Sequence, residues 1–373
     1  METSGSTLHV GLAPADLVAA FQRRGPFATL YLQTDPAIEN AAQYSERHWR
    51  ACREQLTEGG APESVLSAID PVIAEAHLRG GGLGVLADAE GFLHVEHHPQ
   101  PPVLDVARWS PLPSVVGLLE WRQGHVPHVL VLTDRRGADI YATDARGRES
   151  YSEAGGSDLP VEKVAPGGWS QRRYQARADV AWDQNASDVA DEVVRLVDRI
   201  DAGLVAVAGD VRATQLLHKH LPERVDRIVH PIDGGRSPDG SDVRIAQETA
   251  RLIATAAARD TVAVLEKFRD ERGEHDRAAD GPAATAAALR EARVDVLLVH
   301  DDPEDDRVAW FGDEPTDLAL DRNDLVSLGR EHLREARLVD VFARAALGTG
   351  ASVRVVPKHG GPAENVGAVL RWG

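Results

Sequence analysis

The sequence predicts a mixed α/β protein of three domains. Its 373 residues suit two or three domains at roughly 100–200 residues each. Hydrophobic residues make up 43% of the chain, which is enough for several cores and argues against global disorder. Helical periodicities alternate with short apolar strands along most of the chain, a pattern typical of α/β folds. The expected domains are residues 1–124, 125–272 and 273–373.

The first domain is predicted to be an α/β domain with a hairpin. Pro14 suits the first turn of a helix, and the alternating run FATLYLQ predicts a strand. Residues 99–113 are rich in proline and carry few signals of regular structure, so we expect an irregular segment there. The expected elements are helices at 15–23, 38–56 and 62–78, and strands at 27–33, 83–86 and 92–96.

The middle domain is predicted to begin with two strands joined by the polar turn at residues 134–137. An irregular stretch then leads into a long helix that starts at about Gln171. The expected elements are strands at 128–133, 138–143, 204–208 and 227–230, helices at 171–200 and 211–220, and a helix-rich connector from 242 to about 272.

The last domain alternates helix and strand around an acidic segment. Residues 301–324 are expected to form a weakly structured insertion, because acidic side chains dominate them. The expected elements are helices at 281–292 and 339–346, and strands at 294–300, 352–356 and 366–370.

Charge and cysteine content exclude several classes of protein. A formal net charge of −18 argues against coating nucleic acid, although local basic patches could still contact RNA. The single cysteine, Cys52, excludes an intramolecular disulfide and a four-cysteine zinc site. We expect Cys52 to be a packing residue in a cytoplasmic protein. No run of about 18 apolar residues predicts a membrane helix, and the N-terminus lacks the features of a secretion signal.

The most unusual stretch is residues 163–182, which is basic within an acidic chain. It contains four basic residues, Lys163, Arg172, Arg173 and Arg177, and one acid, Asp179. The net charge of the stretch is therefore +3. Because Arg173 and Arg177 are four residues apart, they would share one face of a helix. Arginine is well suited to phosphate because its guanidinium group can form two parallel hydrogen bonds.

The same stretch carries small and aromatic residues. Gly167 and Gly168 would give a mobile tip whose backbone can approach a ligand closely, and Ser170 could cap the helix that follows. Trp169 and Tyr174 offer surfaces for base stacking. The stretch therefore predicts an RNA-contacting probe, and the alternative is an ordinary loop followed by a solvated helix.

Other motifs indicate no metal or cofactor. His94, His97 and His98 cluster near Glu96, but a solvated strand end accounts for them. The acidic run 301–306 lacks the spacing of an EF-hand. Asp233-Gly-Gly is not followed by the Lys-Ser/Thr of a phosphate-binding loop, and no hydrolase elbow or zinc-protease helix is present.

The order of segments resembles archaeal and eukaryotic class-I release factors. Gly167-Gly168-Trp169-Ser170-Gln171, between a hairpin and an arginine-rich helix, resembles their Gly-Gly-Gln loop. The run 283–300 and the glycine-containing segments 348–356 and 367–372 resemble their last domain, which is related to kink-turn-binding ribosomal proteins. The resemblance covers residues 125–373 and implies a ribonuclease-H-like middle domain and an α/β-sandwich last domain.

In detail the chain is most similar to the bacterial branch of this superfamily, which includes the Balon-type ribosome hibernation factors. That resemblance implies entry into the A site of the 70S ribosome, alone or delivered by elongation factor Tu, with contacts to 16S and 23S rRNA and none to DNA or membranes. The first domain would face the decoding centre, the middle domain the peptidyl transferase centre, and the last domain the translational GTPase and ribosome stalk. The implied RNA-binding residues are Lys163, Gly167, Gly168, Trp169, Ser170, Gln171, Arg172, Arg173, Tyr174 and Arg177.

One departure from the release-factor pattern bears on catalysis. In release factors the glutamine directly follows the two glycines, whereas here Trp169 and Ser170 intervene before Gln171. The first domain also lacks an Asn-Ile-Lys-Ser stop-codon motif. We therefore expect a non-catalytic hibernation factor. A rescue factor that hydrolyses peptidyl-tRNA through Gln171 and a Pelota-like adaptor stay open as alternatives.

Overall fold

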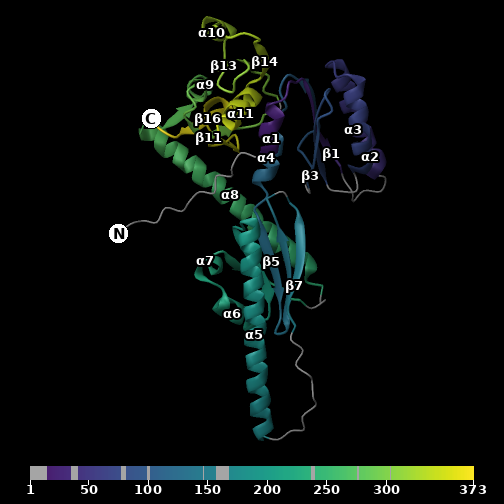
Figure 1. Ribbon diagram of the computed structural model, residues 1–373, viewed down its shortest axis with the longest axis vertical. Helices are drawn as coiled ribbons and strands as arrows, with labels where there is room; N and C mark the ends of the chain where they lie inside the picture. Colours follow the sequence, from purple (N-terminus) through teal and green to yellow (C-terminus); the bar gives the residue numbers. More distant parts are fainter. Residues whose placement is uncertain are drawn as a thin grey trace. The chain divides into compact units, whose positions relative to one another are not determined.

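The computed structural model confirms the mixed α/β class. It forms two compact units, one made of Met1–Trp121 and Thr261–Gly373 and the other of Arg122–Asp260. Each unit combines helices with β-sheet (Figure 1). For residue 41 and residues 168–179 only the backbone is described. The described residues are 15–34, 41–76, 81–98, 101–145, 147–156, 168–236, 240–274, 277–302 and 304–373.

The first unit joins the two ends of the chain. One hydrophobic cluster contains Leu17, Tyr31 and Leu118 together with Leu289 and Phe342, all at most 6% exposed. Burial of these apolar side chains stabilises the N-terminal and C-terminal segments as one body. The division into three domains at residues 124 and 272 stays a prediction.

The N-terminal segment forms a four-stranded antiparallel sheet in the order β3-β2-β1-β4. Its core includes Leu30 and Leu32 from the sheet and Cys52 and Ile69 from two helices, so the expectation of a packed Cys52 is confirmed. The elements are α1 (Ala15–Phe21), β1 (Phe27–Gln33), α2 (Ala41–Glu58), α3 (Glu63–Ala76), β2 (Gly82–Asp88), β3 (Leu93–His98), β4 (Val106–Ser110) and α4 (Val116–Gln123).

The expectation of an irregular segment over residues 99–113 was wrong at Val106–Ser110. These residues form β4, which pairs antiparallel with β1, Phe27 opposite Ser110 and Tyr31 opposite Val106. Five residues between prolines give no convincing period by themselves. The strand exists because the edge of β1 offers backbone hydrogen-bond partners.

The second unit has a five-stranded sheet in the order β7-β6-β5-β8-β9. Neighbours β7, β6 and β5 are antiparallel, while β5, β8 and β9 run parallel. This is the ribonuclease-H-like domain that the resemblance implied. The elements are β5 (His128–Thr133), β6 (Gly137–Thr143), β7 (Glu149–Gly155), α5 (Gly168–Ile200), β8 (Leu204–Gly209), α6 (Val211–His220), α7 (Glu223–Asp226) and β9 (Val229–Pro231).

The expectation of an irregular stretch before the long helix was wrong at Glu149–Gly155, which form strand β7. Tyr151 lies opposite Tyr141 on β6, with ring centroids 5.3 Å apart, and Ser152 donates to Glu192 of α5 at 2.6 Å. The strand's sequence, ESYSEAG, is too polar to predict a strand from periodicity alone.

The C-terminal segment holds two sheets, in the orders β10-β16-β11-β15 and β13-β12-β14. Helix α8 contains the boundary between the two units, which falls after Asp260. The elements are α8 (Asp242–Glu274), β10 (Ala278–Asp280), α9 (Pro282–Arg290), β11 (Val294–Val299), β12 (Val308–Phe311), β13 (Leu318–Ala319), α10 (Arg322–Ser327), β14 (Arg334–Arg337), α11 (Leu338–Gly348), β15 (Ser352–Val355), η1 (Ala363–Asn365) and β16 (Val366–Leu370).

The acidic segment 301–324 is more ordered than its composition predicts. It contains β12, β13 and the start of α10, with Phe311 and Leu318 fully buried. Some of its acids are paired within the fold, since Arg307 pairs with Asp305 and Lys358 lies 3.4 Å from Asp302. No described helix combines the length and apolar character that a membrane span requires.

Candidate RNA-binding site

The basic stretch of the sequence starts helix α5. The helix begins at Gly168, three residues before the predicted start at Gln171. Ser170 therefore lies in the first turn instead of capping the helix, and Gly168 is helical instead of part of a loop. Lys163 and Gly167 lie outside the described residues. The structure places the backbones of the other predicted residues on α5 and does not describe their side chains. These residues are Trp169, Ser170, Gln171, Arg172, Arg173, Tyr174 and Arg177.

The start of α5 is suited to an anion through its backbone. The first four N–H groups of any helix, here those of residues 168–171, have no partner within the helix. The helix dipole adds a partial positive charge at the same end. Phosphate groups commonly bind at helix N-termini for these two reasons. Three arginines within the first ten residues of α5 bring further positive charge to this end.

The second half of α5 anchors the helix on its sheet. Val189, Val193 and Leu196 are at most 2% exposed and pack with Val131 and Ile140 of the sheet. Val180, further toward the start, is 69% exposed. Figure 1 shows α5 continuing well past the ends of β5 and β7. We call residues 168–182 the stalk.

The base of the stalk is held by a clamp around Trp182. The guanidinium groups of Arg135 and Arg212 lie 4.9 and 5.1 Å from the centre of the Trp182 ring. Arg135 belongs to the turn between β5 and β6, and Arg212 belongs to α6. Asn185, 4% exposed, donates from Nδ2 to the carbonyl of Arg135 at 3.2 Å. These contacts orient α5 where it leaves the sheet.

Asp183 connects the stalk to α6 as well. Its Oδ1 lies 2.7 Å from Nζ of Lys219 and 3.1 Å from Nε2 of His220. The hydrogen bond from Lys219, followed by that from His220, lowers the pKa of the Asp183 carboxyl. Asp183 therefore stays ionised at neutral pH and holds two basic residues at the stalk base.

Two glycines allow tight pairing of β6 and β7 at the same end of the sheet. A Cβ at Gly137 would lie 2.3 Å from the carbonyl oxygen of Ala154. Gly155 has φ of +86°, and a Cβ there would lie 2.7 Å from the Cα of Gly137. Only glycine fits both positions, so β6 and β7 approach each other closely at this end of the sheet.

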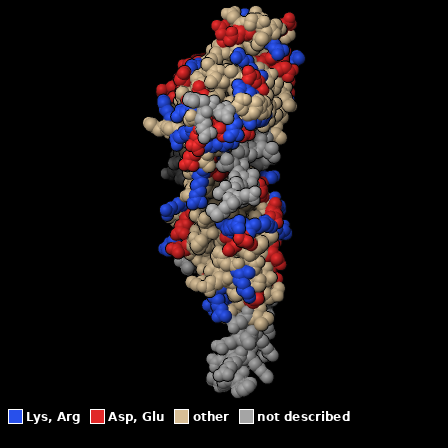
Figure 2. Space-filling view, turned by 90° about the vertical axis from the view of Figure 1, so that its left-hand side faces the viewer, with Lys and Arg blue, Asp and Glu red and all other residues tan. Residues whose placement is uncertain are grey.

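Further arginines at this end of the sheet were not predicted as candidates from the sequence. Arg136 is exposed in the β5–β6 turn, where Asp134 accepts hydrogen bonds from the backbone N–H groups of Arg136 and Gly137 at 2.7 and 3.0 Å. The arginine pair in this turn was visible in the sequence, but its closeness to the stalk follows only from the fold. Elsewhere Lys and Arg are interspersed with Asp and Glu over the face seen in Figure 2.

The histidine cluster shows no sign of a metal site. His98 stacks on Trp121 with ring centroids 4.9 Å apart, and Nε2 of His94 lies 3.4 Å from Glu96. Within the described part of the chain, no three His, Cys, Asp or Glu side chains are arranged to hold an ion. These contacts give His94 and His98 a structural explanation.

Comparison with known proteins identifies relatives of the whole chain. A model of bacterial archaeo-eukaryotic release factor family 2 matches residues 127–274. The "Uncharacterized protein Rv2629" of Mycobacterium tuberculosis strain H37Rv is 30% identical over 361 residues, 95% of each chain. The protein MT2704 of strain CDC 1551 matches equally well.

Solved structures of translation factors also align with the chain. The crystal structure of the archaeal termination factor aRF1 is 16% identical, covers 96% of both chains and has a TM-score of 0.25. Pelota from Archaeoglobus fulgidus is 12% identical, with 96% and 92% coverage and a TM-score of 0.37. A model of ribosome-bound archaeal Pelota and ABCE1 is 13% identical, with 100% and 99% coverage and a TM-score of 0.40.

These observations define a release-factor-like protein with a basic stalk on its second unit. The chain belongs to the bacterial archaeo-eukaryotic release factor family, on the strength of the family model and the full-length relative.

Proposed function

We propose that the protein is a ribosome hibernation factor. It would occupy the A site of the 70S ribosome, alone or delivered by elongation factor Tu, and shield the decoding and peptidyl transferase centres. Family membership supports a role in translation. The stalk is the observation that carries the proposal, because it is a projecting helix with Arg172, Arg173 and Arg177 against one acid, Asp179, and it lies in a stretch whose net charge is +3 over residues 163–182.

The dimensions of α5 suit a probe into a narrow RNA cavity. Residues 168–182, which form the stalk, span about 22 Å at 1.5 Å per residue. The backbone N–H groups at its start and the nearby arginines would contact phosphate, while Trp169 and Tyr174 would stack on bases or sugars. The net charge of −18 would limit nonspecific binding to other RNA.

The helical start of α5 favours occupancy over hydrolysis. Gln171 is the fourth residue of a helix and lies three residues beyond Gly168. A release-factor glutamine directly follows its glycines, so the equivalent position here is Trp169. We therefore propose that the stalk blocks the peptidyl transferase centre without chemistry.

Sedimentation with purified 70S ribosomes over a series of salt concentrations tests this function. The variant Arg172→Ala/Arg173→Ala/Arg177→Ala should bind about tenfold or more weakly, at about 0.5–1 kcal/mol per lost contact. Its slope of log K against log salt should also become shallower by roughly two to three, because each phosphate contact releases counterions.

A matched control removes three exposed arginines from another helix of the same unit. Arg244→Ala/Arg251→Ala/Arg259→Ala on α8 changes the net charge equally and should retain the wild-type affinity and slope. Equal loss in both variants would assign binding to net charge. Full binding by a folded stalk variant would leave the stalk as a solvated helix.

A further inference from the structure

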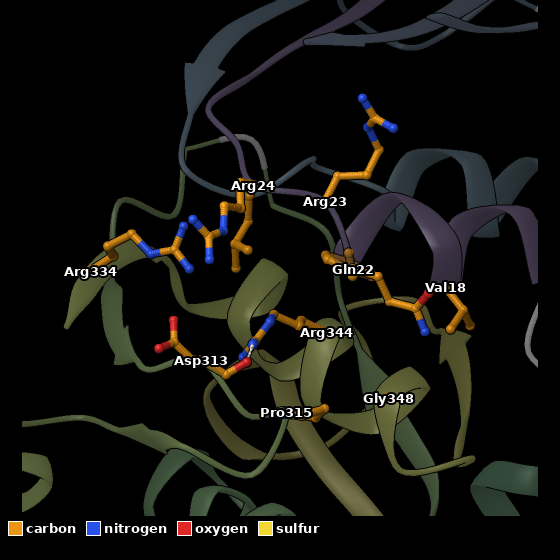
Figure 3. A pocket seen from close by; sticks show the side chains of 11 residues that line it. Val18, Gln22, Arg23, Arg24, Asp313, Pro315, Arg334, Arg344 and Gly348 are labelled. Atoms are coloured by element: carbon orange, nitrogen blue, oxygen red, sulfur yellow. Dashed lines mark hydrogen bonds between the residues drawn. The ribbon is translucent and has the colours of Figure 1, made fainter. Parts of the chain in front are cut away.

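The first unit contains a pocket of about 460 Å³ lined by an unusual number of arginines (Figure 3). Its walls come from α1 and the following turn, the β12–β13 turn, β14 and α11. Arg23, Arg24, Arg334 and Arg344 line it, and Asp313 is the one carboxylate among the lining residues. In a chain of net charge −18, this local excess of positive charge calls for an explanation.

Arg23 has partners of its own. Its Nε lies 2.5 Å from Oδ2 of Asp88, and its guanidinium group lies 5.0 Å from the centre of the Phe92 ring. Figure 3 shows Arg23 pointing away from the other three arginines. The positive charge inside the pocket therefore comes from Arg24, Arg334 and Arg344.

Two of these arginines are held on one aromatic ring. The guanidinium groups of Arg334 and Arg344 lie 4.8 and 5.3 Å from the centre of the Phe311 ring. Arg344 is 6% exposed and donates to the carbonyls of Glu314 and Asp313 at 3.0 and 2.5 Å. Burial, followed by the positive charge of Arg334, lowers the pKa of Arg344. Like charges are thus held together at the pocket wall.

The nearby acids Asp313 and Asp317 form their ion pairs with other residues. Oδ2 of Asp313 lies 3.5 Å from Nδ1 of His332, and Asp317 pairs with Arg330 at 2.8 Å. Within the part of the chain that the structure describes, neither Arg24 nor Arg334 forms an ion pair. In the view of Figure 3 their guanidinium groups point toward one another. An anion between them would relieve the repulsion.

Part of the remaining lining of the pocket is apolar and preformed. Phe21, Leu112 and Pro315 contribute apolar surface to its lining. A Cβ at Gly348 would lie 2.7 Å from the Cβ of Pro315, so glycine at this position lets the β12–β13 turn pack against α11. The volume of about 460 Å³ suits a small organic ligand and exceeds the size of a phosphate ion.

We propose that this pocket binds a small organic phosphate of mononucleotide size. The phosphate would lie between Arg24 and Arg334, where guanidinium groups can each form two parallel hydrogen bonds. The organic part would lie against Phe21, Leu112 and Pro315. Because Arg344 is buried at 6% exposure, it can act on a ligand inside the pocket but not on a phosphate in an RNA backbone outside it.

Calorimetric titration of the full-length protein at low ionic strength tests the proposal. The probes are adenosine diphosphate, guanosine diphosphate, adenosine, and an RNA octamer without terminal phosphate. Binding of at least one diphosphate, without binding of adenosine, is expected. The variant Arg24→Gln/Arg334→Gln should weaken this binding at least tenfold. The charge-matched control Arg50→Gln/Arg290→Gln alters two exposed arginines outside the pocket and should bind as wild type does.

Single Arg24→Gln provides a second variant at an exposed position, and it should weaken binding without lowering the thermal midpoint. Absence of diphosphate binding up to millimolar concentration would refute the site, as would equal affinity in wild type and both pocket variants. If the octamer alone binds and Arg24→Gln/Arg334→Gln abolishes it, the surface contacts RNA instead. If that double variant loses thermal stability with unchanged diphosphate affinity, the arginines serve the fold.

Discussion

The hydroxyl of Ser114 donates a 2.9 Å hydrogen bond to Oδ1 of Asp340, which lies 226 positions further along the chain. Both residues are buried, at 4% and 2% exposure. The backbone carbonyl of Ser114 accepts a second bond, at 2.6 Å, from the hydroxyl of Tyr31. This network joins the N-terminal and C-terminal segments inside the first unit. It places an ionisable group in the shared core.

The pH dependence of stability should report on Asp340. Burial raises its pKa to about 7, although the nearby charge of Arg337 lowers it. The unfolded chain releases this proton near pH 4. Between about pH 4 and 7 the folded state therefore binds more protons, and the free energy of unfolding falls as pH rises, by at most about 1.4 kcal/mol per unit.

Asp340→Asn removes this contribution, so its difference in stability from the wild type should change with pH. The free energy of unfolding of Asp340→Asn minus that of the wild type, measured in urea, should increase as the pH is raised from 5 to 7.5. The control Asp270→Asn, at an exposed position on α8, should show a constant difference. A constant difference for Asp340→Asn as well would mean that Asp340 does not titrate in this range.

Gln171→Ala should leave ribosome binding unchanged, because Gln171 is displaced from the glycine pair and lies within α5. Purified wild-type protein should release no peptide from a ribosome with a loaded P site. A bacterial release factor acting on a stop codon serves as the positive control. Robust release by the wild type, abolished in Gln171→Ala, would favour a rescue enzyme.

Gly155→Ala should destabilise the second unit by about 1–3 kcal/mol, because it adds a clash with Gly137 to the strain of a positive φ. Gly156→Ala is the matched control. Its φ of +97° is similarly unfavourable, but no atom of the described residues lies within 4 Å of the added Cβ. Urea unfolding should show the larger loss for Gly155→Ala, and equal losses would rule out the close strand contact as the cause.

Cys52 should not react with iodoacetamide in the native protein. It is 3% exposed, and burial raises the pKa of its thiol to about 12, so little thiolate forms at pH 8. In urea the thiol should alkylate at the rate of a free cysteine. Mass spectrometry at successive times measures both rates. Rapid labelling of the folded protein would show that the core around Cys52 in the N-terminal segment opens.

The sequence alone determined the elements with a strong period and the composition of the stalk. The alternating run of β1, Phe27–Gln33, and the helix Val211–His220 were predicted to the residue, because their apolar spacing is regular. The +3 charge of residues 163–182 is likewise a property of the sequence.

Only the tertiary structure decided the weak elements and the residues that meet in space. Strands β4 and β7 lack a clear apolar pattern and form because a neighbouring strand supplies hydrogen-bond partners. The Trp182 clamp and the arginine pocket gather side chains from distant segments, the latter joining Arg24 to Arg334. Sequence patterns report local periodicity and composition. Contacts between residues distant in the sequence depend on how helices and sheets pack to bury their apolar faces.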